Sequence, residues 1–301
     1  MSTINSYLGC FKITADDFGY CDERNRGILD AVKEGVVNSV SVLMNASAVE
    51  SINNKNIAVG LHLNLTEGRP VAQPCDVASL LDKEGHFFDK LSIAGHIKGG
   101  RILRVHVDIE IESQIKKFMT VFGHTPFYID GHQHVHILPV IIDGLIKLMK
   151  KYEIKETRVP EELKIADCYW IAQPRLGFYL DVCCNAREAR KCFNRHSISF
   201  PNYFIGLSTM SQDMNEKYLS KALNIISEDI SRNRAEQKCR LVEIMTHPGY
   251  PNQNGKGGCS EKGPDSFSCS PDRKCELNFL KSHIIKDILN DFIMQTFKEK
   301  R

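Results

Sequence analysis

Four short segments of the chain place aspartate or histidine at the end of an apolar run. The segments are ITADDFG (Asp16 and Asp17), GLHLNLTEG (His62), IDGHQHVHILP (Asp130 and three histidines) and THPGY (His247). Carboxylates and imidazoles bind divalent cations and transfer protons, and a bound cation activates water for hydrolysis. If the four segments meet in the fold, they predict the site of a metal-dependent hydrolase.

The third segment is the densest, with His132, His134 and His136 following Asp130. Alternate residues share one face only if the backbone is extended. A turn at Gly131 would separate the histidines and leave one or two of them able to bind a cation. Asp130 would then hydrogen-bond a ligand histidine and fix its tautomer. Because apolar residues flank this segment on both sides, a purely surface histidine cluster is disfavoured and we interpret the segment as functional.

Each of the other segments also has a purely structural interpretation. Asp16 and Asp17 could cap the helix that follows them. His62 could be a hydrogen-bonded histidine of the core. His247, followed by Pro and Gly, could bind a metal ion, protonate a leaving group or belong only to a turn. The functional interpretation therefore depends on the four segments taken together.

Strands that alternate with helices must position these residues. Apolar runs predict strands over 11–16, 36–44, 57–65, 127–129, 157–159 and 239–245. Helical spacing predicts helices over 22–34, 46–52, 107–122, 139–152, 218–232 and 274–298. This alternation predicts an α/β protein with a mostly parallel sheet or barrel, in which the carboxyl ends of the strands form one rim. Asn45 and Arg158 lie at further strand ends and are candidates for supporting the site or contacting a substrate.

Three regions do not follow this alternation. Residues 67–100 are rich in loop-forming residues and resemble an active-site loop or cap. Residues 161–210 show no clear pattern. Residues 252–269 are rich in Gly, Ser, Pro and Asn and predict a mobile surface loop. Because we find no internal repeat and no convincing linker, we expect a single domain over 1–301.

Bulk composition is that of an ordinary globular protein. The 301 residues are 42% hydrophobic and 25% charged, with a net charge of +2, which does not argue for a nucleic acid or a membrane partner. No secretory signal or membrane-spanning run is apparent, so we expect a cytoplasmic protein. The eleven cysteines contain no CxxC pair, and we expect free thiols.

The four motifs, in this order, resemble those of the YdjC-like family, the ChbG-type carbohydrate deacetylases. The resemblance extends over roughly residues 11–250 and has the look of an animal member. It implies a distorted (β/α) barrel like the NodB-like barrel of polysaccharide deacetylases. It also implies an amidohydrolase, acting on C–N bonds other than peptide bonds, that removes N-acetyl groups from acetylated sugars.

The resemblance also implies roles for individual residues. Asp16 would accept a proton from water, His247 would lie near the leaving amine, and Asp17, His62 and His132 would bind one divalent metal ion. His134 and His136 would support the ligands or contact substrate. The metal of the family is usually given as magnesium, but two imidazoles and one carboxylate suit zinc at least as well.

Two other functions remain open from the sequence. One is a metal-dependent phosphoesterase, or another amidohydrolase, that uses the same rim. The other is a non-catalytic scaffold that binds a partner through its polar loops, which an intact set of candidate ligands disfavours. The chain contains no GxSxG elbow, GxxxxGK[ST] loop or HExxH helix. The oligomeric state is open, a homodimer included.

Overall fold

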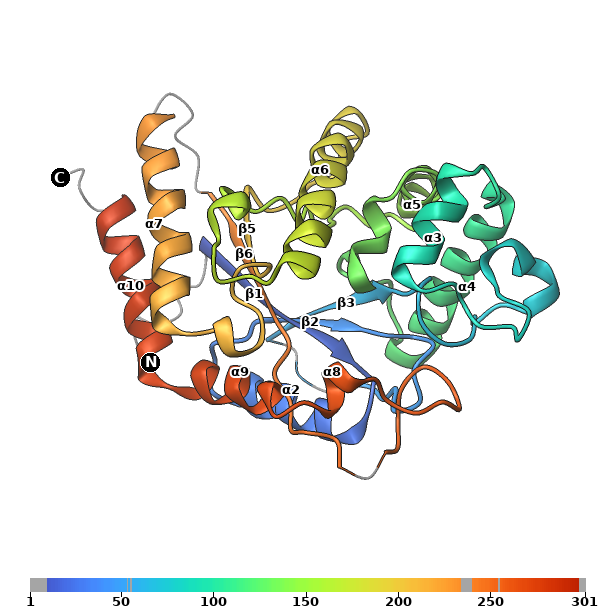
Figure 1. The fold of residues 1–301 in the computed structure, drawn as a ribbon, viewed down its shortest axis with the longest axis horizontal. Coiled ribbons are helices and arrows are strands. Elements are labelled where there is room, and N and C mark those ends of the chain that lie inside the picture. The colour runs from blue at the N-terminus through green and yellow to red at the C-terminus, as the bar shows by residue number, and fades with distance from the viewer. Residues whose placement is uncertain (1–9, 53, 55, 234–239, 254, 298–301) are drawn as a thin grey trace.

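A curved parallel sheet forms the centre of the protein. The computed structural model describes residues 10–52, 54, 56–233, 240–253 and 255–297. Six strands in the described residues pair in the order β4-β3-β2-β1-β6-β5, and all five pairings are parallel (Figure 1). The strands are β1 (Phe11–Phe18), β2 (Ser39–Val42), β3 (Ala58–Leu63), β4 (Ile129–Gly131), β5 (Tyr203–Ile205) and β6 (Val242–Thr246).

Short pairings continue the sheet beyond its edge strand β4. Thr157 pairs in parallel with Ile129 of β4, and the neighbouring Glu156 pairs in parallel with Ser199, shortly before β5. These two bridges extend the ring of strands from β4 towards β5. The observed architecture is therefore an α/β distorted barrel, as the sequence predicts.

Helices surround the sheet and cover its outer side (Figure 1). The α-helices are α2 (Asp22–Lys33), α3 (Lys90–Lys98), α4 (Arg104–Phe122), α5 (Ile141–Lys151), α6 (Gln173–Arg195), α7 (Glu216–Arg232), α8 (Ser266–Cys269), α9 (Asp272–Lys281) and α10 (His283–Phe297). Short 3-10 helices are η2 (Pro74–Leu80), η3 (His132–Ile137), η4 (Ile165–Asp167) and η5 (Ser211–Asp213). Because parallel strands are covered on both faces, β1, β2 and β6 are buried along their whole length.

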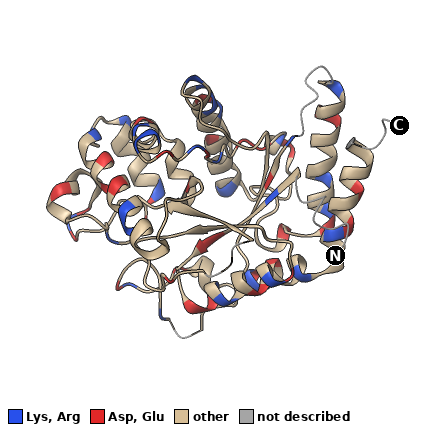
Figure 2. Ribbon diagram, turned by 180° about the vertical axis from the view of Figure 1, so that it is seen from behind, with Lys and Arg blue, Asp and Glu red and all other residues tan. Residues whose placement is uncertain are grey.

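Charges of both signs alternate along the outer helices (Figure 2). Among the described residues, no helix has the length and apolar character that a membrane crossing requires.

Several expected elements differ from those observed. Residues 46–52 are turns rather than a helix, because Ser47 and Ala48 donate backbone hydrogen bonds to Gly258 and Gly19 of neighbouring loops. The expected strand over 157–159 is reduced to the bridge at Thr157. The expected helix over 274–298 is two helices, separated by the extended Ser282. Residue 298 and the expected strand start at 239 lie outside the described residues.

Two of the regions that do not follow the strand–helix alternation, 67–100 and 161–210, contain regular structure. Residues 67–100 include η2 and α3, and residues 161–210 include the 23-residue helix α6 and strand β5. The 252–269 segment packs against the site-side loops, since Gly258 N–H donates to Tyr20 (2.7 Å) and Cys259 accepts from Arg69 N–H (3.1 Å). The single domain and the mobility of this segment stay predictions.

Replacing Gly27 by alanine should destabilise the fold near the site. A methyl group on Gly27 of α2 would lie 2.4 Å from the Cα of Gly249, two residues after His247. Since backbone cannot yield as a flexible side chain can, we expect a loss of about 1–3 kcal/mol in the free energy of unfolding, measured in urea. A methyl group on Gly177 of α6 would have no described atom within 4 Å outside the backbone of its own helix, so Gly177→Ala should be neutral or slightly stabilising. Equal effects of the two changes would contradict close packing at Gly27.

Candidate active site

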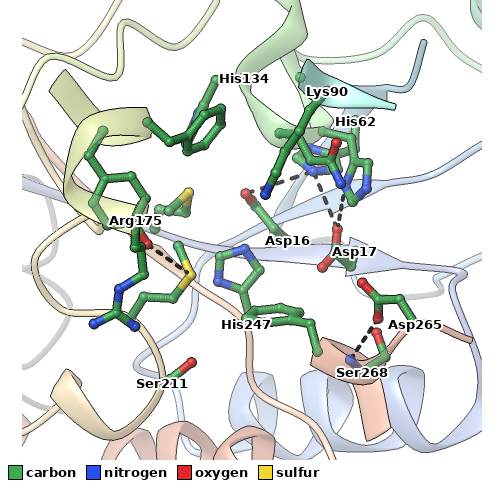
Figure 3. A pocket seen from close by; sticks show the side chains of 18 of the residues that line it. Asp16, Asp17, His62, Lys90, His134, Arg175, Ser211, His247, Asp265 and Ser268 are labelled. Carbon is green, nitrogen blue, oxygen red and sulfur yellow. Dashed lines mark hydrogen bonds and ion pairs between the residues drawn. The ribbon is translucent and has the colours of Figure 1, made fainter. Parts of the chain in front are cut away.

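A cavity of about 460 Å³ lies at the carboxyl ends of the strands (Figure 3). Each of the four sequence motifs contributes to its lining, through Asp16, Asp17, His62, His132 and His247 among others. All five side chains are buried. The expected convergence of the motifs at one rim is therefore observed.

Backbone geometry at the end of β1 turns both aspartates into the site. The pairing register of β1 with β2 shifts between Ala15 and Phe18, and Asp17 adopts a left-handed φ of 68°. Such a conformation costs about 1–3 kcal/mol in a non-glycine residue and is typical of functional sites. The carboxylates of Asp16 and Asp17 thereby face a common cavity, although neighbouring residues of a regular strand point to opposite faces.

His62 of β3 lies between two carboxylates, Asp130 of the neighbouring β4 and Asp17 of β1. Its Nδ1 is 2.7 Å from Asp130 Oδ1, and its Nε2 is 3.4 Å from Asp17 Oδ1. Because β3 and β4 pair with His62 opposite Asp130, the sheet register itself sets the first contact. Asp130 therefore holds a proton on Nδ1, and Nε2 is the nitrogen that faces Asp17 and could bind a cation through its lone pair.

His132 has the same arrangement with a different acid. Its Nδ1 is 3.1 Å from Asp17 Oδ1, and its Nε2 is 3.0 Å from Glu67 Oε2. Glu67 is itself fixed by the Tyr20 hydroxyl, which donates to Oε1 over 2.6 Å. Glu67 was not among the residues selected from the sequence, although it lies within the GLHLNLTEG motif, because loop residues give no local indication of their partners.

The donor set of Asp17, His62 and His132 fits a divalent metal ion. Their ligand atoms lie within 4.8 Å of one another, and each histidine uses its second nitrogen for an outer carboxylate, as metal-binding histidines usually do. A second group of three, Asp16, His62 and Asp130, is also close enough. That group fits a cation poorly, because the Arg158 guanidinium already contacts both of its carboxylates.

The electrostatics of the two histidines agree with a site for positive charge. Burial disfavours a charged imidazole, but Asp130 and Asp16 outweigh it and raise the pKa of His62 to about 9. Burial is likewise outweighed at His132, where Asp17 and Glu67 raise the pKa to about 10. Protons or a cation must balance these carboxylates, and a divalent cation could replace the protons.

Arg158 fixes the orientation of Asp16. The fully buried guanidinium binds both oxygens of Asp16, at 2.7 and 2.8 Å, pairs with Asp130 at 2.9 Å, and donates from Nε to Glu243 over 3.0 Å. Burial raises the pKa of Asp16 to about 6, against the opposing effect of Arg158. Asp16 is therefore mostly ionised at neutral pH and more basic than an ordinary aspartate. Glu243, which also accepts from Thr14 Oγ1, was not predicted from the sequence.

The three histidines of the dense motif diverge, as expected for a turn. The turn comes after Gly131, which is extended, and lies at Gln133 and His134, both with left-handed φ values. His132 faces Asp17, and His134 lines the cavity. His136 donates from Nε2 to the carbonyl oxygen of Arg158 over 3.0 Å and so supports the arginine.

His134 of the IDGHQHVHILP motif and His247 of the THPGY motif are buried histidines whose pKa values are lowered. Burial, with Arg158 nearby, lowers the pKa of His134 well below its usual value. Burial also lowers the pKa of His247 well below its usual value, against the effect of Asp17. Both rings are therefore neutral at physiological pH.

His247 is fixed through its backbone. Its N–H donates to Glu276 over 2.7 Å, and its carbonyl accepts from Arg24 and Arg273. The ring points into the cavity beside Asp17 (Figure 3).

Asn45 supports a loop rather than the cavity. Its Nδ2 donates to the carbonyl oxygens of Glu67 and Arg69 over 3.0 Å each, and its Oδ1 accepts from Asn64. Asn45 thereby holds the loop that carries Glu67 and lies behind the ligands.

Side chains from α3 and α6 form the outer part of the cavity. They are Lys90 and Leu91 of α3 and Pro174, Arg175, Phe178 and Tyr179 of α6, together with Met210. Lys90 Nζ lies 4.7 Å from the centre of the Phe178 ring and so joins the two helices across the opening. None of these residues was selected individually from the sequence. Helix α3 lies in the 67–100 region that was expected to form an active-site loop or cap, and α6 lies in the 161–210 region, which shows no clear pattern.

The fold and the site place this protein among α/β barrels with a candidate metal centre, because carboxylates and imidazoles converge at the carboxyl ends of the strands. The sequence comparisons define this class further. The model of the YdjC-like protein family matches residues 11–291. This chain therefore belongs to the YdjC-like family.

Two animal relatives that match almost the full length of this chain are named carbohydrate deacetylase, and a bacterial relative with a related name matches less than half of it. A carbohydrate deacetylase of Danio rerio is 36% identical over 288 residues, covering 91% of this chain and 92% of the relative. A carbohydrate deacetylase of Mus musculus is 38% identical over 279 residues, covering 91% and 88%. A chitooligosaccharide deacetylase of Yersinia enterocolitica is 35% identical over 134 residues, covering 43% and 51%.

A solved structure supports the fold. The crystal structure of the Enterococcus faecalis V583 protein described as a "putative cellobiose-phosphate cleavage protein" superposes with a TM-score of 0.64 and 21% identity, covering 94% of each chain. At this identity the similarity concerns the fold alone.

Proposed function

We propose that the protein is a metal-dependent hydrolase that removes the N-acetyl group from acetylated amino sugars or short oligosaccharides. The observation that carries this proposal is the pair of histidines, His62 and His132, that converge on Asp17 while each is held by an outer carboxylate. Homologues named carbohydrate deacetylase and chitooligosaccharide deacetylase support the substrate class.

We assign Asp17, His62 and His132 as the ligands of a single divalent ion. When bound, such an ion polarises an acyl carbonyl and acidifies water. Two nitrogens and one oxygen suit zinc at least as well as the magnesium expected from the family. A cytoplasmic location and a homodimer stay predictions.

The other residues of the site would move the protons. Asp16, held by Arg158, takes a proton from the water that attacks the acetyl carbonyl carbon. When the C–N bond breaks, the amine needs a proton. A neutral His247 cannot supply it as a resting acid, so we propose that the proton on Asp16 returns to the amine. His247 would hydrogen-bond the departing nitrogen.

The test is acetate release from N-acetylglucosamine and short chitin oligosaccharides. Protein stripped of metal should be inactive, regain activity with zinc or magnesium, and contain a single bound ion by mass spectrometry. His132→Ala should lose both the ion and the activity, since it removes a ligand. His196→Ala, at an exposed histidine, is the matched control and should retain both.

Two outcomes would contradict the proposal. A bound ion without acetate release, with phosphate released from phosphorylated sugars in a parallel assay, would support the phosphoesterase. A protein that binds no ion at all would support the scaffold. Retention of the ion by His132→Ala would refute the ligand assignment.

A further inference from the structure

Two adjacent residues of the cavity wall have strained backbones. Gln133 and His134, which follow the proposed ligand His132, have φ values of 51° and 60°. Left-handed conformations are unfavourable for residues other than glycine and persist where the surroundings impose them, frequently at ligand sites. Both residues line the cavity.

The same two residues have buried polar atoms without partners. Among the described residues, neither Gln133 Oε1 nor His134 Nδ1 has a hydrogen-bond partner. His134 is only 6% exposed. An unsatisfied buried polar group destabilises the fold unless a ligand provides the missing bond. His134 contacts the Phe204 ring edge to face, with centroids 6.3 Å apart, so packing fixes its ring.

The chemistry of these atoms favours a hydroxyl group as their ligand. An amide oxygen such as Gln133 Oε1 can only accept a hydrogen bond, and a neutral imidazole accepts at one nitrogen and donates at the other. A sugar hydroxyl both donates and accepts, so it can satisfy both residues. An anionic group could not donate to Gln133.

The distance along the chain limits which hydroxyl this is. Consecutive Cα atoms are about 3.8 Å apart, so Gln133 and His134 lie within about one sugar ring of the metal ligand His132. The acyl group under attack must be at the metal site. Since His132, Gln133 and His134 line the same cavity, this closeness favours a hydroxyl on a carbon next to the acetamido carbon over one on a more distant ring.

We propose that Gln133 and His134 bind a free hydroxyl on a ring carbon adjacent to the acetamido carbon and make the enzyme selective for sugars in which it is unsubstituted. This specificity site rests on the proposed deacetylase function. It would favour the 3-hydroxyl or the anomeric hydroxyl of an N-acetylated amino sugar and reject rings blocked at that position.

Removing the partners one at a time tests this proposal. The substrates are N-acetylglucosamine, its 3-deoxy, 1-deoxy and 6-deoxy analogues, and the variants are Gln133→Met and His134→Asn. Methionine keeps the length of glutamine without its acceptor, and asparagine tolerates left-handed backbone. Wild type should lose about tenfold in kcat/KM on either the 3-deoxy or the 1-deoxy analogue, and little on the 6-deoxy analogue.

The deciding comparison is whether the loss caused by the deoxy substrate is smaller in the variants than in wild type. Gln133→Met and His134→Asn should each lose about tenfold in kcat/KM on N-acetylglucosamine. Their kcat/KM on the deoxy analogue should fall no further, because the same hydrogen bond is already lost. Gln212→Met, at an exposed glutamine, should behave as wild type. A variant that loses the same factor on every substrate, or that keeps the wild-type discrimination, overturns the proposal and indicates a structural role.

Binding of the same sugars, followed by saturation-transfer NMR, separates this proposal from the proposed function. If wild type binds N-acetylglucosamine without releasing acetate, and the variants bind it about tenfold more weakly, the hydroxyl site stands and the deacetylase function fails. If acetate is released but the variants bind and discriminate as wild type does, the function stands and the hydroxyl site is overturned. A wild-type protein that binds none of these sugars overturns both.

Discussion

Replacing Asp16 by asparagine should lower kcat by about 10²–10⁴-fold while the protein retains its metal ion. A positioned general base contributes about this factor, and an amide cannot take a proton from water. Asp16 suits the role because its raised pKa of about 6 leaves it ionised near neutrality, yet basic enough to accept a proton. Its neighbour Asp17 has a pKa lowered well below its usual value, since bonds from His132 and His62 outweigh burial. The two adjacent carboxylates thus differ as a base and a ligand should.

The measurement combines steady-state kinetics with metal content. Asp16→Asn should bind the ion as wild type does, whereas Asp17→Asn should lose it, so the two neighbouring substitutions separate the roles. Asp143→Asn, at an exposed aspartate of α5, controls for the loss of a carboxylate elsewhere. If Asp16→Asn retains kcat within a factor of about three, another group must act as the base. A factor of about three lies far below the smallest effect, about 10²-fold, that loss of a general base would produce.

The candidate ligands stood out in the sequence because each lies at or near the end of an apolar run, and the family resemblance then singled out three of them. The sequence places Asp17, His62 and His132 directly at strand ends, and parallel strands bring such ends to one rim. Within the dense motif, however, the sequence left open how many histidines bind a cation. The turn at Gln133 and His134 decides this, and positive φ values at residues other than glycine have no sequence signature.

Two supporting acids, Glu243 and Glu67, could not be predicted because their partners are far away in the chain. Glu243 contacts Arg158 and Thr14, which are 85 and 229 positions away. Glu67 contacts His132 from a loop 65 positions earlier. A buried acid in a strand or a loop acid next to Gly looks ordinary until the tertiary structure shows its partner. Sequence reasoning singled out the groups that would bind the ion and the supporting Asp130, Arg158 and His136, but it missed the acids Glu67 and Glu243.

The part of the cavity wall formed by α6 was also missed, for a different reason. The buried positions of helix α6 (Gln173–Arg195) recur at helical spacing, but a cysteine and two alanines are among them and charged residues lie between them. The apolar signal in the sequence was therefore too weak to be recognised as a helix. It nevertheless supplies Phe178 and Tyr179 to the cavity. A cap formed by weakly patterned helices is the part of a barrel enzyme that sequence periodicity describes least well.

Replacing Arg158 by methionine should lower the free energy of unfolding by about 3–5 kcal/mol. Removing one member of a buried ion pair leaves its partners charged and desolvated, and Arg158 is fully buried with Asp16, Asp130 and Glu243 around it. Against a typical total of about 5–15 kcal/mol, this is a large loss. Activity should fall too, because Asp16 loses both contacts that orient it.

Urea unfolding of Arg158→Met, with Arg187→Met as the matched control, measures this effect. Arg187 pairs with Glu161 at 3.0 Å on the surface, where a pair contributes about 0–1 kcal/mol. If the buried carboxylates cause the loss, the double variant Arg158→Met, Glu243→Gln should be more stable than Arg158→Met alone, because it removes one unpaired charge. Arg158→Lys should fold better than Arg158→Met yet remain slow, since lysine keeps the charge but cannot hold both oxygens of Asp16. A double variant that is less stable than Arg158→Met would instead mean that packing, not charge, makes this arginine necessary.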